Sequence, residues 1–215
     1  NAGVVGTDVT GVGTARYSLG ACSYGDDKGI FGFGYASPSK LSMTNLVSNA
    51  GVVATDTTGV GTARMNIAAC EYGEDKGIFG FGFISADTAI TNLVSNAGVV
   101  ATDTTGVGTA RDYVAACGYG EDKGIFGFGK TTTEVSMTNL VSNAGVVATD
   151  VTGVGTARHD PGACEYGGDK AIFGFGQDGS SYVSMTNLVS SSGVVATDTT
   201  GVGTARGYVG ACSFN

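Results

Sequence analysis

The sequence predicts an all-β repeat protein, and three observations support this prediction. The stretch GVVATDTTGVGTAR at residues 51–64 recurs with small changes every 47–48 residues, at residues 3–16, 98–111, 145–158 and 193–206. Short runs rich in β-branched and aromatic residues are separated by turn signals at close intervals. No window shows the helical spacing of apolar residues, and 38 glycines among 215 residues would make helices costly.

Each repeat contains four strand candidates, which residues 14–61 show in order. Residues 16–24 run from an arginine into small residues, residues 28–34 read KGIFGFG, residues 42–48 alternate between polar and apolar, and residues 51–56 are rich in valine. Glycine, aspartate, asparagine and serine between these runs suit tight turns. Four antiparallel strands per repeat of this length are typical of a β-propeller blade. A β-solenoid is the alternative, but its coils are usually shorter and lack a hairpin turn after every strand.

The repeats therefore predict one domain over residues 1–215, a β-propeller of about five four-stranded antiparallel blades. Complete units cover residues 14–61, 62–108, 109–155 and 156–203, and partial units cover residues 1–13 and 204–215. The partial units leave two loose strands, residues 3–8 and 206–214, as expected of a piece of a longer array or of a processed chain. We expect the small residues of each first strand to line the axis. Phe31, Phe33 and their equivalents should pack between blades.

A family resemblance supports this fold. The run TARMNIAACEYGEDKGIFGFG at residues 62–82 resembles a kelch repeat, in which an arginine enters an inner strand of small residues and a strand of the type KIYVFGG follows. The resemblance covers essentially the whole chain and implies a propeller. The chain departs from the family in having Phe-Gly-Phe-Gly in place of the double glycine, and in lacking tryptophan. The array is also similar to repetitive ones in phage and marine microbial proteins, which favours an extracellular or virion-surface location.

Composition removes several functional classes. The net charge of −8 argues against nucleic-acid binding, which needs a basic face. No run approaches the roughly 18–20 continuous apolar residues of a membrane span. The five cysteines occupy one repeat position, which suits small buried residues with free, unreactive thiols better than disulfides or a metal ring. They are Cys22, Cys70, Cys117, Cys164 and Cys212.

Catalysis has little support in the sequence. His159 is the single histidine, and no other repeat reproduces it, so we interpret it as a surface residue rather than as part of a catalytic triad. The repeated aspartate of the Asp-x-Thr-Gly turns is explained by local side-chain-to-backbone bonds without a metal. The repeated arginine is expected to satisfy neighbouring carbonyls or the repeated aspartate, and an anion-binding ring is the alternative. We therefore predict a protein that is not an enzyme and has no metal or cofactor.

The informative feature is where the repeats differ. One variable window follows the arginine, at residues 17–19, 65–67, 112–114, 159–161 and 207–209, and the other follows Phe-Gly-Phe-Gly, at residues 35–41, 83–89, 130–135 and 177–183. Because strands alternate in direction within an antiparallel blade, both windows should emerge on one face, and the uniform turns on the other. Loops on a rigid scaffold commonly carry binding specificity. Unrestrained drift is the alternative, but the uniform turns are exposed too and scarcely vary.

The variable face is therefore predicted to bind a protein or glycan ligand, as an adhesion or lectin-like module of a phage fibre or cell surface. The alternative is a structural repeat protein whose loose strands complete a blade in a homo-oligomer or fibre. The candidate contact residues beside the axis are Tyr17, Met65, Tyr113, His159 and Tyr208. Those further out are Tyr35, Phe83, Lys130 and Tyr182.

Overall fold

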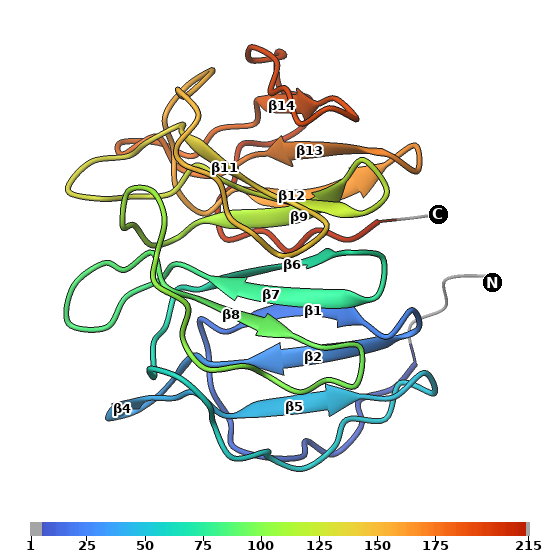
Figure 1. The fold of residues 1–215 in the computed structure, drawn as a ribbon. Coiled ribbons are helices and arrows are strands. Elements are labelled where there is room, and N and C mark those ends of the chain that lie inside the picture. Colours follow the sequence, from blue (N-terminus) through green and yellow to red (C-terminus); the bar gives the residue numbers. More distant parts are fainter. Residues whose placement is uncertain (1–5, 214–215) are drawn as a thin grey trace.

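The computed structural model describes residues 6–213 and is all β, without a helix in that range (Figure 1). Accordingly, the described part of the chain offers no helical segment long and apolar enough to cross a membrane.

Each complete repeat forms one three-stranded antiparallel sheet whose second strand lies in the middle. Sheet 1 consists of β1 (Gly20–Tyr24), β2 (Lys28–Gly32) and β5 (Thr44–Val47), and sheet 2 of β6 (Ala68–Tyr72), β7 (Lys76–Gly80) and β8 (Thr91–Val94). Sheet 3 consists of β9 (Ala115–Tyr119), β10 (Lys123–Gly127) and β11 (Thr138–Val141), and sheet 4 of β12 (Gly162–Tyr166), β13 (Lys170–Gly174) and β14 (Thr186–Val189). Repeat 1 adds a short hairpin, β3 (Tyr35–Ala36) and β4 (Ser39–Lys40).

The predicted fourth strand is present only in part. In repeat 1 it meets the outer edge of the sheet through two isolated bridges, Val47 with Val53 and Thr44 with Thr57. The ladder is interrupted because Asp56 turns away from it and accepts hydrogen bonds from the amide and the hydroxyl of Thr14, at 2.9 and 2.7 Å. The equivalent aspartates do the same in the other repeats, so these aspartates bind across 41–42 residues and not within a local turn as expected.

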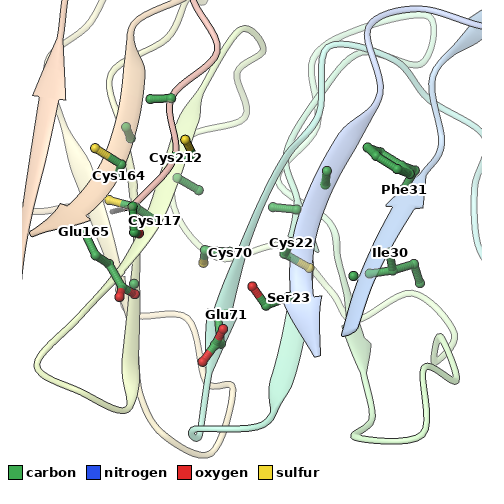
Figure 2. Close-up of a pocket in the computed structure, with 18 of the residues that line it drawn as sticks. Cys22, Ser23, Ile30, Phe31, Cys70, Glu71, Cys117, Cys164, Glu165 and Cys212 are labelled. Carbon is green, nitrogen blue, oxygen red and sulfur yellow. The ribbon is translucent and has the colours of Figure 1, made fainter. Parts of the chain in front are cut away.

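The first strands of successive sheets lie side by side, β1 against β6, β6 against β9 and β9 against β12. Their alanines, glycines and cysteines line a shared central cavity of about 580 Å³, as the sequence predicts (Figure 2). Phenylalanines pack edge-to-face between neighbouring sheets, with ring centroids 5.2 Å apart for Phe33 and Phe79. The equivalent pairs are Phe81 with Phe126 and Phe128 with Phe173. The described residues form four such sheets and no closed ring.

The two loose terminal strands are not formed in the described residues. Residues 3–5 and 214 of these predictions lie outside that range, and residues 6–8 and 206–213 have no strand pairing. The C-terminal segment, residues 206–213, nevertheless lies against sheet 4, since a Cβ added at Gly162 would approach Val209 to 2.8 Å. Residues 206–213 therefore lie where the first strand of a fifth sheet would lie, and no strand of the described residues pairs with them.

A buried arginine joins each repeat to the one before it. Arg64 is fully buried and donates from Nε to the Phe81 carbonyl at 2.9 Å and from Nη2 to Asn92 Oδ1 at 2.7 Å. Its guanidinium also lies over the ring of Phe33 in the preceding repeat, 4.3 Å from the centroid, and its carbonyl accepts a bond from Gly34 at 3.0 Å. Burial lowers the pKa of Arg64 to about 10, partly offset by Asp103. We call this set of contacts the arginine clasp. Arg111 and Arg158 repeat it.

The cysteines are all free thiols, but their burial differs. Cys70 and Cys117 are buried, Cys22 and Cys164 are half-buried, and Cys212 is exposed. Cys22 Sγ packs where a glycine of the next sheet leaves room, since a Cβ at Gly77 would lie 2.6 Å from it. Cys212 has no following sheet to cover it, so the prediction of uniform burial is wrong at this position.

The arginine clasp should dominate stability. Arg111→Lys removes the planar fork, so that the carbonyl of Phe128 and the side chain of Asn139 lose their buried donor. We expect a loss of about 3–5 kcal/mol in the free energy of unfolding by urea, because each buried acceptor left without a donor costs about 1–3 kcal/mol. Arg206→Lys is the matched control, because Arg206 is exposed, and should cost less than about 1 kcal/mol. Equal costs for the two variants would contradict the account.

Thiol labelling should separate the cysteines. Because Cys212 is exposed, it should react quickly with a thiol reagent in the native protein, and Cys212→Ser should remove that fast phase. Burial raises the pKa of Cys22 to about 12 and keeps it protonated, so it should react slowly. Fast labelling of Cys70 or Cys117 in the native protein would be incompatible with the central cavity as described.

Candidate ligand-binding face

The two variable windows of each repeat meet on one face of the molecule. Isolated backbone bridges join Tyr17 to Tyr35, Met65 to Phe83, Asp112 to Lys130, and His159 to Gln177. Each bridge connects the residue after the arginine with the residue after Phe-Gly-Phe-Gly in the same repeat. The structure therefore places both windows together, as strand alternation predicts. We call the surface formed by these windows the variable face.

A polar cavity of about 260 Å³ lies at the centre of the variable face. We call the window after the arginine the first window of a repeat, and the second residue of every first window lines this cavity. These five residues share a left-handed backbone with φ between 50° and 56°. They are Ser18, Asn66, Tyr113, Asp160 and Tyr208. The apolar third residues Leu19, Ile67 and Val114 complete the lining. We call this cavity the axial pocket; five equivalent positions thus present a hydroxyl, an amide, a carboxyl and two phenols to it.

Of the predicted contact residues, Tyr113 and Tyr208 line the axial pocket. The others lie elsewhere on the variable face, because they occupy the first window position or the second window, both of which lie away from this pocket. Tyr17 lies against Tyr35, with ring centroids 5.4 Å apart. Tyr17, Tyr182 and Tyr208 are well exposed, whereas Met65, Phe83, Tyr35 and Lys130 are half-buried.

His159 is not the surface residue that the sequence suggests, since it is only 6% exposed. Its ring centroid lies 5.6 Å from that of Tyr113, and its Nδ1 lies 3.3 Å from Glu134 Oε1. Lys130 Nζ approaches the same carboxylate at 3.1 Å. Burial and the nearby Lys130 lower the pKa of His159, which favours its neutral form. His159 therefore packs against Tyr113, a residue that lines the axial pocket, without lining the pocket itself.

One acidic side chain, Asp160, lines the axial pocket, and a second, Asp112, lies beside it and binds the lining residue Asn66. Asp112 is buried and accepts a hydrogen bond from Asn66 Nδ2 at 2.9 Å; burial raises its pKa to about 6. Burial, together with the charge of Asp112, raises the pKa of Asp160 to about 7. Asp160 Oδ2 is buried without a hydrogen-bond partner, and His159 Nε2 lies 3.8 Å from it. An unpaired buried acceptor is costly when it is charged, which is consistent with the raised pKa of this carboxyl.

Ser18, Asn66, Asp112 and Asp160 are not among the residues predicted from the sequence, because the prediction favoured large side chains of the variable windows, mostly aromatic, regardless of their position within the window. A signal was present in the window after the arginine: its second residue is serine, asparagine, aspartate or tyrosine in every repeat, and its third residue is always apolar. Among residues 6–213, no group of three histidine, cysteine or acidic side chains is placed to hold a metal ion. Comparison with protein-family models and with curated proteins finds no match for this chain.

The Asp160 carboxyl should make stability depend on pH. Its raised pKa means that the folded state holds a proton that the unfolded state releases between about pH 4 and pH 7, so stability falls as pH rises through that range. Asp160→Asn removes this loss, and we expect it to raise the free energy of unfolding at pH 8 by roughly 1–3 kcal/mol, with a smaller increase at pH 5 and little change below pH 4.

Asp178→Asn is the control for this pH experiment. Backbone amides of Ser181 and Ser180 lower the pKa of Asp178, so replacing it should not stabilise the protein at pH 8. If Asp160→Asn and wild type have the same pH profile in urea unfolding, the carboxyl of Asp160 is not in the environment described.

Proposed function

We propose that the chain is a non-catalytic binding module, a β-propeller in which each sheet with its fourth segment is a blade, and that it recognises a glycan on the variable face. The observation that carries this proposal is the axial pocket. Five structurally equivalent positions there hold four different residue types, whereas the residues that build the scaffold around them are nearly identical in every repeat. Internal variation concentrated in one cavity favours a composite, asymmetric site.

The size and chemistry of the axial pocket favour one sugar ring. A volume of about 260 Å³ accommodates a small group rather than an extended polymer. The phenol rings of Tyr113 and Tyr208 offer flat apolar surface to the C–H groups of a sugar. Asp160, Asn66 and Ser18 offer a carboxyl, an amide and a hydroxyl to its hydroxyl groups.

Backbone conformation gives further support. Tyr113 and Tyr208 have φ values of 53° and 56°, a region that glycine and asparagine occupy at lower cost than a bulky residue. Retaining tyrosine there costs stability of order 1 kcal/mol per residue. The scaffold also holds phenylalanine at φ 61–64° in each complete repeat, so this backbone supports the proposal only together with the position of both tyrosines in the axial pocket.

A self-assembling structural protein is the second candidate, because apolar surface is exposed at one end of the series of sheets. Phe31 of sheet 1 is 38% exposed, while its equivalents Phe79, Phe126 and Phe173 are fully buried. Under either candidate, an extracellular or virion-surface location is an inference from the resemblance of the array to repetitive ones in phage and marine microbial proteins, and a glycan ligand fits that location.

A glycan array probed with the labelled chain tests the proposal. We expect a defined set of glycans sharing one terminal sugar, and Tyr113→Asn or Tyr208→Asn should weaken binding by about 1–3 kcal/mol, the range for hot-spot residues. Because asparagine suits the backbone at both positions, neither variant should lose stability in urea unfolding.

The control variant for this assay is Asp122→Asn with Lys123→Gln, in the uniform turn of the opposite face. It should leave binding unchanged. Tyr182→Ala, on the variable face outside the pocket, should have a smaller effect than Tyr113→Asn. Binding that survives both axial-pocket variants and is lost in the opposite-face variant would mean that the face is wrongly assigned.

A further inference from the structure

One contact repeats between every pair of neighbouring sheets. A phenylalanine of one sheet lies over a glycine in the second strand of the preceding sheet. A Cβ added at Gly32 would lie 2.7 Å from Cζ of Phe79, and the same distance holds for Gly80 with Phe126 and for Gly127 with Phe173. Each glycine therefore leaves the space into which the next phenylalanine fits.

At each end of the series of sheets, one half of this contact is present and its partner is missing. Gly174, the equivalent glycine of sheet 4, has only Thr186 within 4 Å of an added Cβ. Phe31, the equivalent phenylalanine of sheet 1, is 38% exposed, although phenylalanine at the same position is fully buried in the other three sheets. One end thus lacks a phenylalanine, and the other lacks the glycine that would receive one.

The Gly174 end is already shaped as a receptor. A cavity of about 290 Å³ opens over Gly174 and is lined by Ile172, Phe175, Arg206 and Val209 among others. The guanidinium of Arg206 lies 4.0 Å from the centroid of the Phe175 ring, as the other arginines do in the clasp. Residues 206–213 therefore hold the position of a first strand, and no strand of residues 6–213 pairs with them as the second strand does in every complete repeat.

Both ends border the same space. The central cavity of about 580 Å³ is lined by Ile30, Phe31 and Val47 of sheet 1 and also by Ala211, Cys212 and Ser213 of the C-terminal segment. Figure 2 shows Phe31 and Ile30 on one side of this cavity and Cys212 with Cys164 on the other. The cavity over Gly174 shares Ala163, Cys164 and Ala211 with this central cavity, so one element seated across both would contact Gly174 and Phe31.

We propose that this opening, between residues 206–213 and sheet 1, is a docking site for a β-hairpin that carries the repeat's own second- and third-strand sequence. The inserted strand pairs with the free edge of residues 206–213, as in strand addition to a sheet edge. Its Ile-Phe-Gly-Phe stretch places the first phenylalanine over Gly174, and the glycine that follows receives Phe31. The three internal sheet-to-sheet contacts supply the geometry, and the proposal does not depend on glycan binding.

A hairpin fits this opening better than a whole second copy of the chain. A second copy presents β2 together with its own first strand β1, because the two are paired over five residues. That β1 would need the place that residues 206–213 already occupy against sheet 4. A hairpin of second and third strands brings no first strand and leaves the C-terminal segment where it is.

The test uses the full chain and a synthetic peptide of residues 120–142, titrated by calorimetry. We expect one-to-one binding. In the peptide, Phe126→Ser removes the ring for Gly174 and Gly127→Val fills the space for Phe31, and each should weaken binding at least tenfold. In the protein, Phe31→Ser and Gly174→Val should do the same. Val194→Ser is the matched control, since Val194 is exposed on the outer edge of sheet 4 and its replacement should leave binding unchanged.

A fusion protein tests the same proposal in case the free peptide is insoluble or aggregates. Fusing residues 118–142 after residue 215 should raise the unfolding temperature, and Phe31→Ser should cancel the increase. Peptide binding that is indifferent to both Phe31→Ser and Gly174→Val would overturn the proposal, as would a fusion with no added stability. Light scattering that shows self-association of the unmodified chain, lost on Phe31→Ser and not displaced by peptide, would identify a second copy as the occupant and also overturn it.

Discussion

The structure depends on a buried arginine at the entrance to each first strand. Arg64, Arg111 and Arg158 are fully buried, and each is satisfied by carbonyl and amide oxygens of its own repeat while its flat face lies on a phenylalanine of the preceding repeat. A guanidinium meets these demands because it donates in a fixed plane and stacks on an aromatic ring. The clasp thus fixes both the fold within a repeat and the position of one repeat on the next. An anion-binding role for these arginines is excluded by their burial and full set of partners.

This arrangement separates the residues that hold the fold from those that differ. The arginine, its asparagine partner, the phenylalanines and the aspartate that binds threonine are the same in all four complete repeats. They bring the second residue of each window that follows an arginine to one point, where the backbone is left-handed in every case. The side chains at that point can then change without disturbing the clasp. The five positions around the axial pocket hold four residue types, in Ser18, Asn66, Tyr113, Asp160 and Tyr208.

The sequence was sufficient for features that repeat and insufficient for those that occur once. The cysteine-lined cavity and the Phe33–Phe79 contact follow from spacing and side-chain size, because every repeat imposes them. The fourth strand was overestimated, since its valines suggest a full ladder while Asp56 leaves it for a threonine 42 residues away. His159 was misplaced because its burial depends on Glu134 and Tyr113 of the preceding repeat, a pairing that no pattern within its own window reveals. The raised pKa of Asp160 has the same origin, in its burial beside Asp112.

The central claim is that scaffold and site are carried by separate residues, and a symmetrised chain tests it most directly. In this chain Ser18, Tyr113, Asp160 and Tyr208 are all replaced by asparagine to match Asn66, which suits the left-handed backbone at each position. Urea unfolding at pH 8 should give a free energy equal to or higher than that of wild type, while the glycan bound by wild type should no longer bind measurably. Retained binding of the same glycan, or loss of the cooperative fold, would contradict the account.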